Sequence, residues 1–183
     1  MFQVRIHGRG GQGVVTAAEL LSVAAFLEGK HAQGFPSFGS ERMGAPVMAF
    51  CRVSSQEIRL REPIMEPDAI IIQDSTVIES ENVFQGLVNN GSALINSSTN
   101  IAAALGIKLV TIKCINATAI AMAHIGRPLP NAVLLGSFAA FTGIVNIESV
   151  VKAIDMQFPK AIAEKNIAAA RNAYEETKST AAV

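Results

Sequence analysis

Four glycines lie within six residues near the start of the chain, a spacing that is typical of a turn that cradles an anion. The turn consists of Gly8, Arg9, Gly10, Gly11, Gln12 and Gly13. Glycines let the backbone bend sharply and direct N–H groups toward a phosphate at the start of a following helix. The same residues also suit a turn that packs closely on a neighbouring backbone, so both interpretations stay open.

A Rossmann-type NAD site needs an acidic residue about 20 positions after the glycine turn, where the second strand ends. The corresponding segment, Lys30 to Ser37, contains Gly34 and Pro36 but neither Asp nor Glu, and it is expected to be an irregular loop. A nucleoside-triphosphate loop is also disfavoured, because no Lys-Ser or Lys-Thr pair follows Gly13. The sequence therefore argues against an NAD-dependent enzyme and leaves another phosphate or pyrophosphate as the candidate ligand.

A second segment, Gln33–Pro46, is rich in glycine and proline and is expected to form a long loop. It carries Phe35, Phe38, Glu41 and Arg42. Loops of this length in compact domains are usually functional, and exposed phenylalanines mark surfaces that partners cover. We expect Phe35, Phe38 and Glu41 at a subunit interface. Arg42 is expected either to assist the glycine turn in holding an anion or to pair with Glu41 or a partner chain.

The other candidate groups form no recognisable catalytic constellation. His7 could be a general base, but no Ser or Cys nucleophile with a clear partner accompanies it, so a hydrogen-bonded strand-end histidine is expected. No cluster of His, Asp and Glu has metal-ligand spacing. The chain has two cysteines, Cys51 and Cys114, which are too few for a four-thiolate iron–sulfur cluster or a cysteine zinc site. Two buried free thiols are expected, although one disulfide is arithmetically possible.

Short apolar segments alternate with helical patterns and supply the elements that must position these groups. The expected strands are Phe2–Ile6, Val47–Val53, Ala69–Gln73, Ser92–Ile95 and Leu109–Lys113. The expected helices are Val14–Glu28, Thr76–Glu81, Asn100–Leu105, Ala117–Ile125, Ala132–Thr142, Ile147–Phe158 and Lys160–Lys178. Ala69 to Ile72 is apolar on both faces, as in a central parallel strand, whereas the strand after Pro46 is expected to be antiparallel or at an edge.

This order predicts one domain over residues 1–183 with an α/β fold: a Rossmann-like, doubly wound, mostly parallel sheet with a helical C-terminal region. The apolar strands end in small or polar residues, namely His7-Gly8, Asp74-Ser75, Asn96-Ser97 and Asn116. Ligands of open α/β sheets gather at the carboxyl ends of strands, so a site is expected there. The same residues are also ordinary helix caps and turn residues.

Composition limits the possible partners. Half of the 183 residues are hydrophobic and 16% are charged, against an average of about 25%. Such a chain often hides surface against partner subunits, although a compact α/β core explains the same composition. The formal net charge of zero argues against nucleic-acid binding. The first residues are expected to form a core strand and not a signal peptide, and no apolar segment reaches the ~18 residues of a membrane span, so we expect a cytoplasmic location.

Taken together, these segments resemble the gamma subunit of 2-oxoacid:ferredoxin oxidoreductases. The resemblance rests on Arg5-x-His-Gly-Arg-Gly-Gly-Gln-Gly-Val-Val-Thr-Ala-Ala-Glu19, on Gly29-Lys-x-Ala-Gln33 and on Phe35-Pro-Ser-Phe-Gly-x-Glu-Arg-x-Gly-Ala-Pro-Val47. It continues through Pro67-Asp68, Asn116-Ala-Thr118 and Pro130-Asn131-x-x-x-Leu-Gly136, and it covers about the whole chain. The loop resembles pyruvate and branched-chain enzymes more than 2-oxoglutarate enzymes. Met43 stands where the family often has a second arginine.

The resemblance implies a subunit of an assembly that decarboxylates a 2-oxoacid with thiamine diphosphate, passes electrons through iron–sulfur clusters to ferredoxin, and releases an acyl-coenzyme A. Thiamine diphosphate is then expected in the alpha and beta subunits and the clusters in the delta subunit, with no cofactor held by this chain alone. The chain is expected to pack on the catalytic subunits, to help form the coenzyme A site with the glycine turn, and to be inactive in isolation.

Two other functions stay open. One is a stand-alone nucleotide- or coenzyme-binding module, and the other is the gamma subunit of a 2-oxoglutarate-type enzyme.

Overall fold

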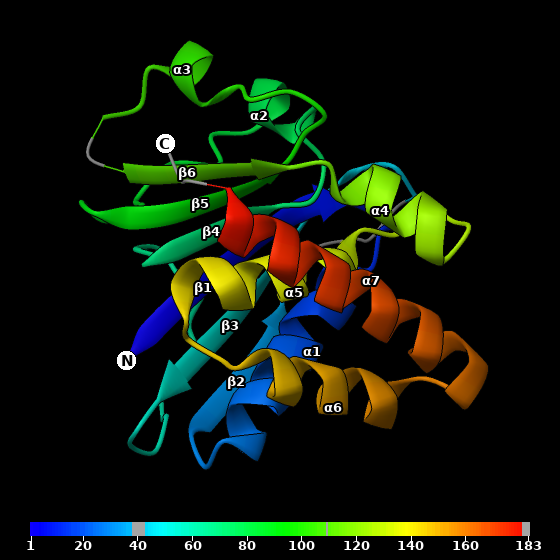
Figure 1. Cartoon of the computed structure of the whole chain (residues 1–183). Helices are drawn as coiled ribbons and strands as arrows, with labels where there is room; N and C mark the ends of the chain where they lie inside the picture. Colours follow the sequence, from blue (N-terminus) through cyan, green and yellow to red (C-terminus); the bar gives the residue numbers. More distant parts are fainter. Residues whose placement is uncertain (38–42, 109, 181–183) are drawn as a thin grey trace.

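The computed structural model describes residues 1–37, 43–108 and 110–180. Within them a six-stranded sheet has the strand order β2-β3-β1-β4-β5-β6 (Figure 1). The strands are β1 (Phe2–Arg9), β2 (His31–Pro36), β3 (Pro46–Ser54), β4 (Ala69–Ile72), β5 (Gly91–Asn96) and β6 (Val110–Ile115). β1, β4, β5 and β6 are parallel, whereas β3 pairs antiparallel with both β1 and β2. The mostly parallel α/β fold is thus confirmed.

Helices cover both faces of the sheet but unequally (Figure 1). They are α1 (Val14–Leu27), α2 (Val77–Ser80), α3 (Ala102–Leu105), α4 (Ala117–His124), α5 (Asn131–Thr142), α6 (Ile147–Gln157) and α7 (Lys160–Ser179). The long helices α1, α5, α6 and α7 pack on one face around the larger core, and the one-turn helices α2 and α3 lie on the other. The helical C-terminal region is confirmed.

Strand β4 shows why the sheet is doubly wound. Ala69 and Ile71 belong to the larger core under the long helices, while Ile70 and Ile72 belong to the smaller core under α2 and α3. All four residues have no exposed surface. Successive strand residues point to opposite faces, so an uninterrupted apolar strand needs cover on both sides.

The segment His31–Pro36 forms β2 and not an irregular loop. This also corrects the expected loop Gln33–Pro46, whose first four residues belong to β2 and whose last residue begins β3. β2 is the edge strand and pairs with β3 alone, a position that tolerates the missing N–H of Pro36. Gly34 is required because a Cβ there would lie 2.6 Å from the carbonyl oxygen of Ala18 in α1. The strand after Pro46 is antiparallel as expected, and β2 keeps it from being an edge.

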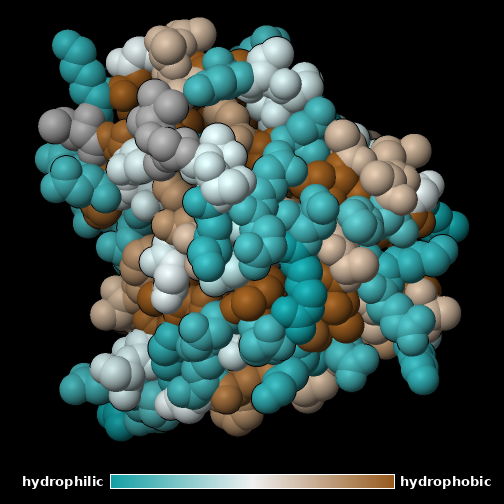
Figure 2. Space-filling model, in the orientation of Figure 1, coloured by the Kyte–Doolittle hydropathy of each residue, from teal (hydrophilic) through white to brown (hydrophobic). Residues whose placement is uncertain are grey.

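The outer surface of the long helices is largely hydrophilic, and hydrophobic residues show mainly in the gaps between them (Figure 2). This pattern is usual where each helix buries one face on a core. Both cysteines are free: Cys51 is buried, as expected, and burial raises the pKa of its thiol to about 12, whereas Cys114 is only half-buried. Across residues 1–37, 43–108 and 110–180, none of the helices is long and apolar enough to span a bilayer.

The C-terminal helix α7 is held to the sheet by polar contacts at its last turn. Lys113 of β6 is 4% exposed, and its Nζ donates to the carbonyl oxygens of Thr177 and Thr180. An ammonium at a helix C-terminus interacts favourably with the helix dipole. The hydroxyls of Ser137 in α5 and Thr177 share a buried 2.6 Å hydrogen bond. These contacts hold the last turn of α7 on β6 and α5.

Helices α5 and α7 approach each other to backbone contact. A Cβ at Gly136 of α5 would lie 2.0 Å from the carbonyl oxygen of Ala170 in α7. Alanines such as Ala163, Ala169 and Ala173 are fully buried along α7. The two helices can approach this closely because Gly136 has no side chain where it meets the backbone of Ala170.

We predict that Gly136→Ala lowers the free energy of unfolding by about 3 kcal/mol, because the new methyl group forces the two helices apart. Helix propensity alone predicts the opposite sign, a gain of about 1 kcal/mol. Urea denaturation followed by circular dichroism measures the difference. The matched control Ala168→Gly, at an exposed position of α7, should cost only about 1 kcal/mol. An unchanged or increased stability of the Gly136 variant would contradict the packing argument.

Candidate functional site

The glycine turn connects β1 to α1 at the carboxyl edge of the sheet. Gly11 and Gly13 have φ angles of 92° and 73°, in the region that disfavours side chains, and Gly13 directly precedes α1. A Cβ at Gly13 would lie 2.5 Å from Nδ2 of Asn131, and one at Gly8 would lie 2.7 Å from a methyl group of Val14. Close packing therefore explains why positions 8 and 13 are occupied by glycine.

The backbone N–H groups of the turn divide into paired and unpaired ones. The N–H of Arg9 donates to Oε1 of Gln12 at 2.9 Å, and that of Gly10 donates to the carbonyl oxygen of Ala45 at 2.9 Å. The N–H of Gln12 donates to the carbonyl oxygen of Arg9. Those of Gly11 and Gly13 have no acceptor in the described part of the chain. The turn thus retains two donors beside the N-terminus of a 14-residue helix.

The charged side chains at the turn are bound to one another. Nε of Arg9 donates to Oγ1 of Thr76 at 2.9 Å and lies 3.8 Å from Oδ2 of Asp74, and Nη1 donates to the carbonyl oxygen of Gly44. Nε2 of Gln12 donates to Oδ2 of Asp74 at 2.8 Å. Arg9 and Gln12, both expected to contact a ligand, are therefore anchored on Asp74 in this structure.

Asp74 is a stable anion in this network. Burial alone would raise the pKa of its carboxyl group, but the hydrogen bonds from Thr76 and Gln12 and the charge of Arg9 outweigh burial and lower the pKa. The negative charge of Asp74 compensates Arg9, so the described residues at the turn give no excess of positive charge.

A cavity of about 640 Å³ lies at the carboxyl ends of β4, β5 and β6, next to the glycine turn. It is lined by Gly10, Gly11, Gln12, Met43, Gln73, Asp74, Ser75, Asn96, Ser97, Ser98, Asn116, Thr118, Pro128, Leu129 and Pro130. The polar ends of β4, β5 and β6 thus meet at one place, as the topology predicts, whereas His7 and Gly8 line a different cavity. Several of them also have structural roles: Asn116 accepts the N–H of Ala119 as the N-cap of α4, and Asn96 bonds to Thr118.

Gln73 is a residue of this cavity wall that sequence analysis did not single out. It is 1% exposed, and neither its Nε2 nor its Oε1 has a hydrogen-bond partner among residues 1–37, 43–108 and 110–180. A buried polar group without a partner costs about 1–3 kcal/mol. The signal in the sequence is a glutamine directly after the all-apolar strand Ala69–Ile72.

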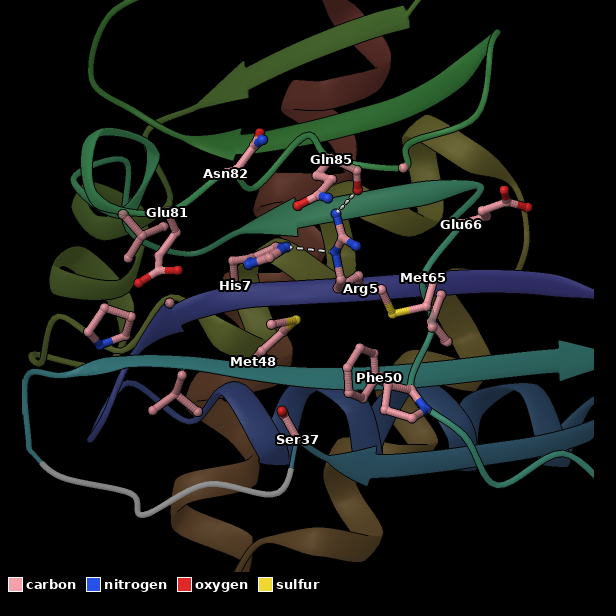
Figure 3. A pocket seen from close by; sticks show the side chains of 17 residues that line it. Arg5, His7, Ser37, Met48, Phe50, Met65, Glu66, Glu81, Asn82 and Gln85 are labelled. Carbon is pink, nitrogen blue, oxygen red and sulfur yellow. Dashed lines mark hydrogen bonds between the residues drawn. The ribbon is translucent and has the colours of Figure 1, made fainter.

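A second cavity, of about 650 Å³, lies on the other side of β1 (Figure 3). Arg5 and His7 of β1 and Met48 and Phe50 of β3 contribute to its wall. Sequence analysis weighed His7 as a general base, expected a hydrogen-bonded strand-end histidine instead, and assigned no role to Arg5. Both are 6% exposed, and Nε of Arg5 donates to Nε2 of His7 at 3.0 Å. The expectation of a hydrogen-bonded strand-end histidine is confirmed.

The environment of His7 keeps its imidazole neutral. Burial, reinforced by the charge of Arg5, lowers its pKa to about 3. Because Nε2 accepts the Arg5 hydrogen bond, the proton of the neutral ring resides on Nδ1.

The residues expected at a partner interface are only partly placed. Phe38, Glu41 and Arg42 lie outside the described residues. Phe35 belongs to β2, with its ring 5.2 Å from that of Phe50 and under the guanidinium of Arg52. Part of its apolar surface is therefore covered within the chain, and its contact with a partner stays a prediction. No group of three or more His, Cys, Asp or Glu side chains in the described ranges is arranged to hold a metal ion.

The fold and the glycine turn define an α/β domain of one enzyme family. The model of the pyruvate ferredoxin/flavodoxin oxidoreductase family matches residues 3–176, and the chain belongs to this family. It is 51% identical over 176 residues to pyruvate synthase subunit PorC of Methanocaldococcus jannaschii, and the match covers 96% of this chain and 97% of that protein. It is 44% identical over 181 residues to the pyruvate/ketoisovalerate oxidoreductases common subunit gamma of Pyrococcus furiosus, covering 97% and 98% of the two chains.

A solved structure supports the same relationship. The crystal structure of pyruvate oxidoreductase subunit PORC from Thermotoga maritima superposes with a TM-score of 0.83 at 35% identity and covers 95% of each chain. The resemblance to 2-oxoacid:ferredoxin oxidoreductase gamma subunits is thus confirmed, over almost the full chain and in three dimensions.

We predict that His7 makes stability depend on pH. Its folded pKa of about 3 lies below the value of about 6.5 in an unfolded chain, so between these values the unfolded state binds more protons. Its contribution is complete above about pH 6.5 and decreases toward pH 3, with a limiting slope of about 1.4 kcal/mol per pH unit. Urea denaturation at pH 7, 5.5 and 4 should show this loss.

The control is His7→Gln, which keeps a neutral hydrogen-bond acceptor for Arg5 and removes the titrating ring. The stability difference between the wild type and this variant should shrink or reverse as the pH falls. A difference that stays constant from pH 7 to pH 4 would mean that folding does not lower the pKa of His7.

Proposed function

We propose that this chain is the gamma subunit of a pyruvate or 2-ketoisovalerate:ferredoxin oxidoreductase. In the proposed complex, alpha and beta subunits hold thiamine diphosphate, a delta subunit holds iron–sulfur clusters, and ferredoxin accepts the electrons as the 2-oxoacid is converted to an acyl-coenzyme A. The observation that carries the proposal is the similarity, over 96–97% of this chain, to a pyruvate synthase subunit PorC and to a common subunit gamma of pyruvate/ketoisovalerate oxidoreductases.

The chain is proposed to pack on the catalytic subunits and to hold no redox cofactor itself. Phe35, Phe38 and Glu41 are the proposed contacts with them. The half-covered ring of Phe35 at the edge strand β2 supports this, since an edge strand beside an apolar surface is a common place for association.

The glycine turn is proposed to contact the phosphates of coenzyme A. The two unpaired N–H groups of Gly11 and Gly13 lie at the N-terminus of α1, where the positive end of the helix dipole favours an anion. The turn borders the cavity at the strand ends, which has room for part of a large ligand. Arg9 and Gln12 are the proposed side-chain contacts, together with Gly8 and Gly10 of the same turn.

Binding of a phosphate at the glycine turn requires a further positive charge. Asp74 already holds Arg9 and Gln12, so a phosphate needs a further cation to offset the carboxylate. We propose Arg42 for this role, because an arginine gives charge-assisted, bidentate contacts to phosphate. The alternatives are a stand-alone coenzyme-binding module, for which the turn and cavity would suffice, and a 2-oxoglutarate-type gamma subunit.

We predict that the purified chain alone does not reduce a viologen dye when given pyruvate, thiamine diphosphate and coenzyme A. A tagged copy expressed in its native host should instead co-purify chains that bind thiamine diphosphate and iron–sulfur clusters, and the co-purified complex should reduce the dye. Dye reduction by the isolated chain contradicts the subunit role. Recovery of the tagged chain as a monomer without partners supports the stand-alone module.

We predict that Arg42→Ala in the assembled complex raises the KM for coenzyme A about tenfold to a hundredfold and leaves the KM for the 2-oxoacid nearly unchanged. The loss of one charge-assisted contact, about 1.5–3 kcal/mol, sets this range. Arg9→Ala should act in the same direction, because it also frees Asp74 to repel the phosphates. Steady-state kinetics on complexes of verified subunit composition give both constants.

The control for these kinetics is Arg59→Ala, whose side chain is 85% exposed and pairs with Glu57 far from the turn. It should change neither constant. If Arg9→Ala and Arg42→Ala both leave the KM for coenzyme A unchanged, the glycine turn has a packing role only.

A further inference from the structure

The cavity beside β1 is built differently from the one at the strand ends. It lies on the face of the sheet that carries the smaller core under α2 and α3, where side chains of β1 and β3 remain open to the cavity and Val77 of α2 lines one part of it (Figures 1 and 3). Side chains of β1 and β3 form its floor, and residues 63–66 and 81–86 form its rim. Its volume of about 650 Å³ is typical of a small-molecule site.

The floor contains a buried positive charge. Arg5 is 6% exposed; its Nη2 donates to the carbonyl oxygens of Val83 and Gln85, at 2.9 and 2.5 Å, and its Nε donates to His7. Its Nη1 has no acceptor, and the guanidinium has no carboxylate partner, in the part of the chain that the structure describes. A buried charge without a counter-ion is unfavourable unless something supplies one.

The neighbour of Arg5 cannot supply that counter-ion. His7 is neutral near pH 7, and its Nε2 accepts from Arg5. Its Nδ1 therefore carries the proton and is a second donor in the cavity wall. Figure 3 shows the two side chains next to each other on β1, linked by this hydrogen bond. The guanidinium is held in place by its two carbonyl contacts, so one terminal nitrogen remains for a ligand.

The rest of the wall is mainly apolar. Phe50 and Met48 form the floor beside Arg5, and Ile64 also lines the cavity. Two carboxylates, Glu66 and Glu81, also line the cavity, but both are solvent-exposed. Solvent weakens their field at the buried Arg5, while together they disfavour a ligand with several negative charges. The wall thus suits one negative charge on an apolar body.

We propose that this cavity binds a small monocarboxylate with an apolar body. The carboxylate accepts from Nη1 of Arg5 and from Nδ1–H of His7, and the apolar part contacts Phe50 and Met48. Such a ligand supplies the missing counter-ion and covers the open apolar floor in one step. The site differs from the cavity at the strand ends and shares only Gly8 with the glycine turn. It carries no chemistry and does not depend on the coenzyme A proposal.

The test uses the purified full chain at pH 7 and three probes: 3-methylbutanoate, phenylacetate and the uncharged 3-methylbutanamide. Titrations followed by ¹H–¹⁵N NMR should show saturable shifts around Arg5, His7 and Phe50 with both acids. The amide should bind at least tenfold more weakly, because it offers no charge to Arg5. Equal binding of acid and amide, or no saturable binding of either acid, overturns the proposal.

Substitutions locate the binding. Arg5→Met keeps the apolar stem and removes the charge, and it should weaken acid binding at least tenfold. Arg5→Lys preserves the charge and should retain part of the affinity. It serves as the second variant if Arg5→Met does not fold. Glu81→Gln should strengthen acid binding by removing a repulsive carboxylate. Arg59→Gln, at a side chain that is 85% exposed, is the matched control and should leave the affinity unchanged.

Two results would refute the site. One is an equal loss of affinity in Arg5→Met and Arg59→Gln, which would indicate non-specific charge attraction. The other is that no acid binds while Arg5→Met loses partner chains in co-purification, which would assign the charge to a partner's carboxylate instead of a small molecule.

Discussion

Strand β1 is hydrogen-bonded along both of its edges, and the other features of the molecule depend on that pairing. It pairs antiparallel with β3 from Phe2 to Arg9 and parallel with β4 from Val4 to His7. Pairing on both sides fixes which side chains face which layer, since a slip of one residue would exchange the faces. Val4 and Ile6 consequently lie in the main core, while Arg5 and His7 lie in the open cavity. The same pairing places the glycine turn beside the ends of β4 and β5.

The layers of the fold could be predicted from the sequence because they follow from local patterns. The apolar strand at Ala69, the helical spacing after Asn146 and the alternation of strands with helices each reflect a periodicity within a short segment. β2 was missed because its stability comes from β3 and from contact with α1, and its sequence contains Gly34 and Pro36. Both residues argue against a strand locally, yet one permits the approach of α1 and the other sits at an edge.

The candidate sites, like the strands, could be predicted only where the signal lies within a short segment of the sequence. The glycine turn was found because its spacing is unusual, and the meeting of the polar strand ends follows from parallel topology. Arg5 and Gln73 were not found, because an arginine in a strand and a glutamine at the end of a strand are both ordinarily expected to reach solvent. Their burial results from residues distant in the sequence, such as Val83 and Gln85 for Arg5. For Arg5, the available signal was its period-two placement with His7 on one face of β1.

The two cavities differ in charge although both border on β1. At the glycine turn Arg9 is neutralised by Asp74, and the unpaired donors are backbone N–H groups, which carry partial charges. Beside His7 the guanidinium of Arg5 is held by carbonyl oxygens, which orient it without neutralising it. A polyanion at the glycine turn therefore requires a cation from outside the described residues, whereas a single carboxylate at Arg5 requires none. Among the described residues, Arg9 thus lies beside a carboxylate, whereas Arg5 contacts only neutral acceptors.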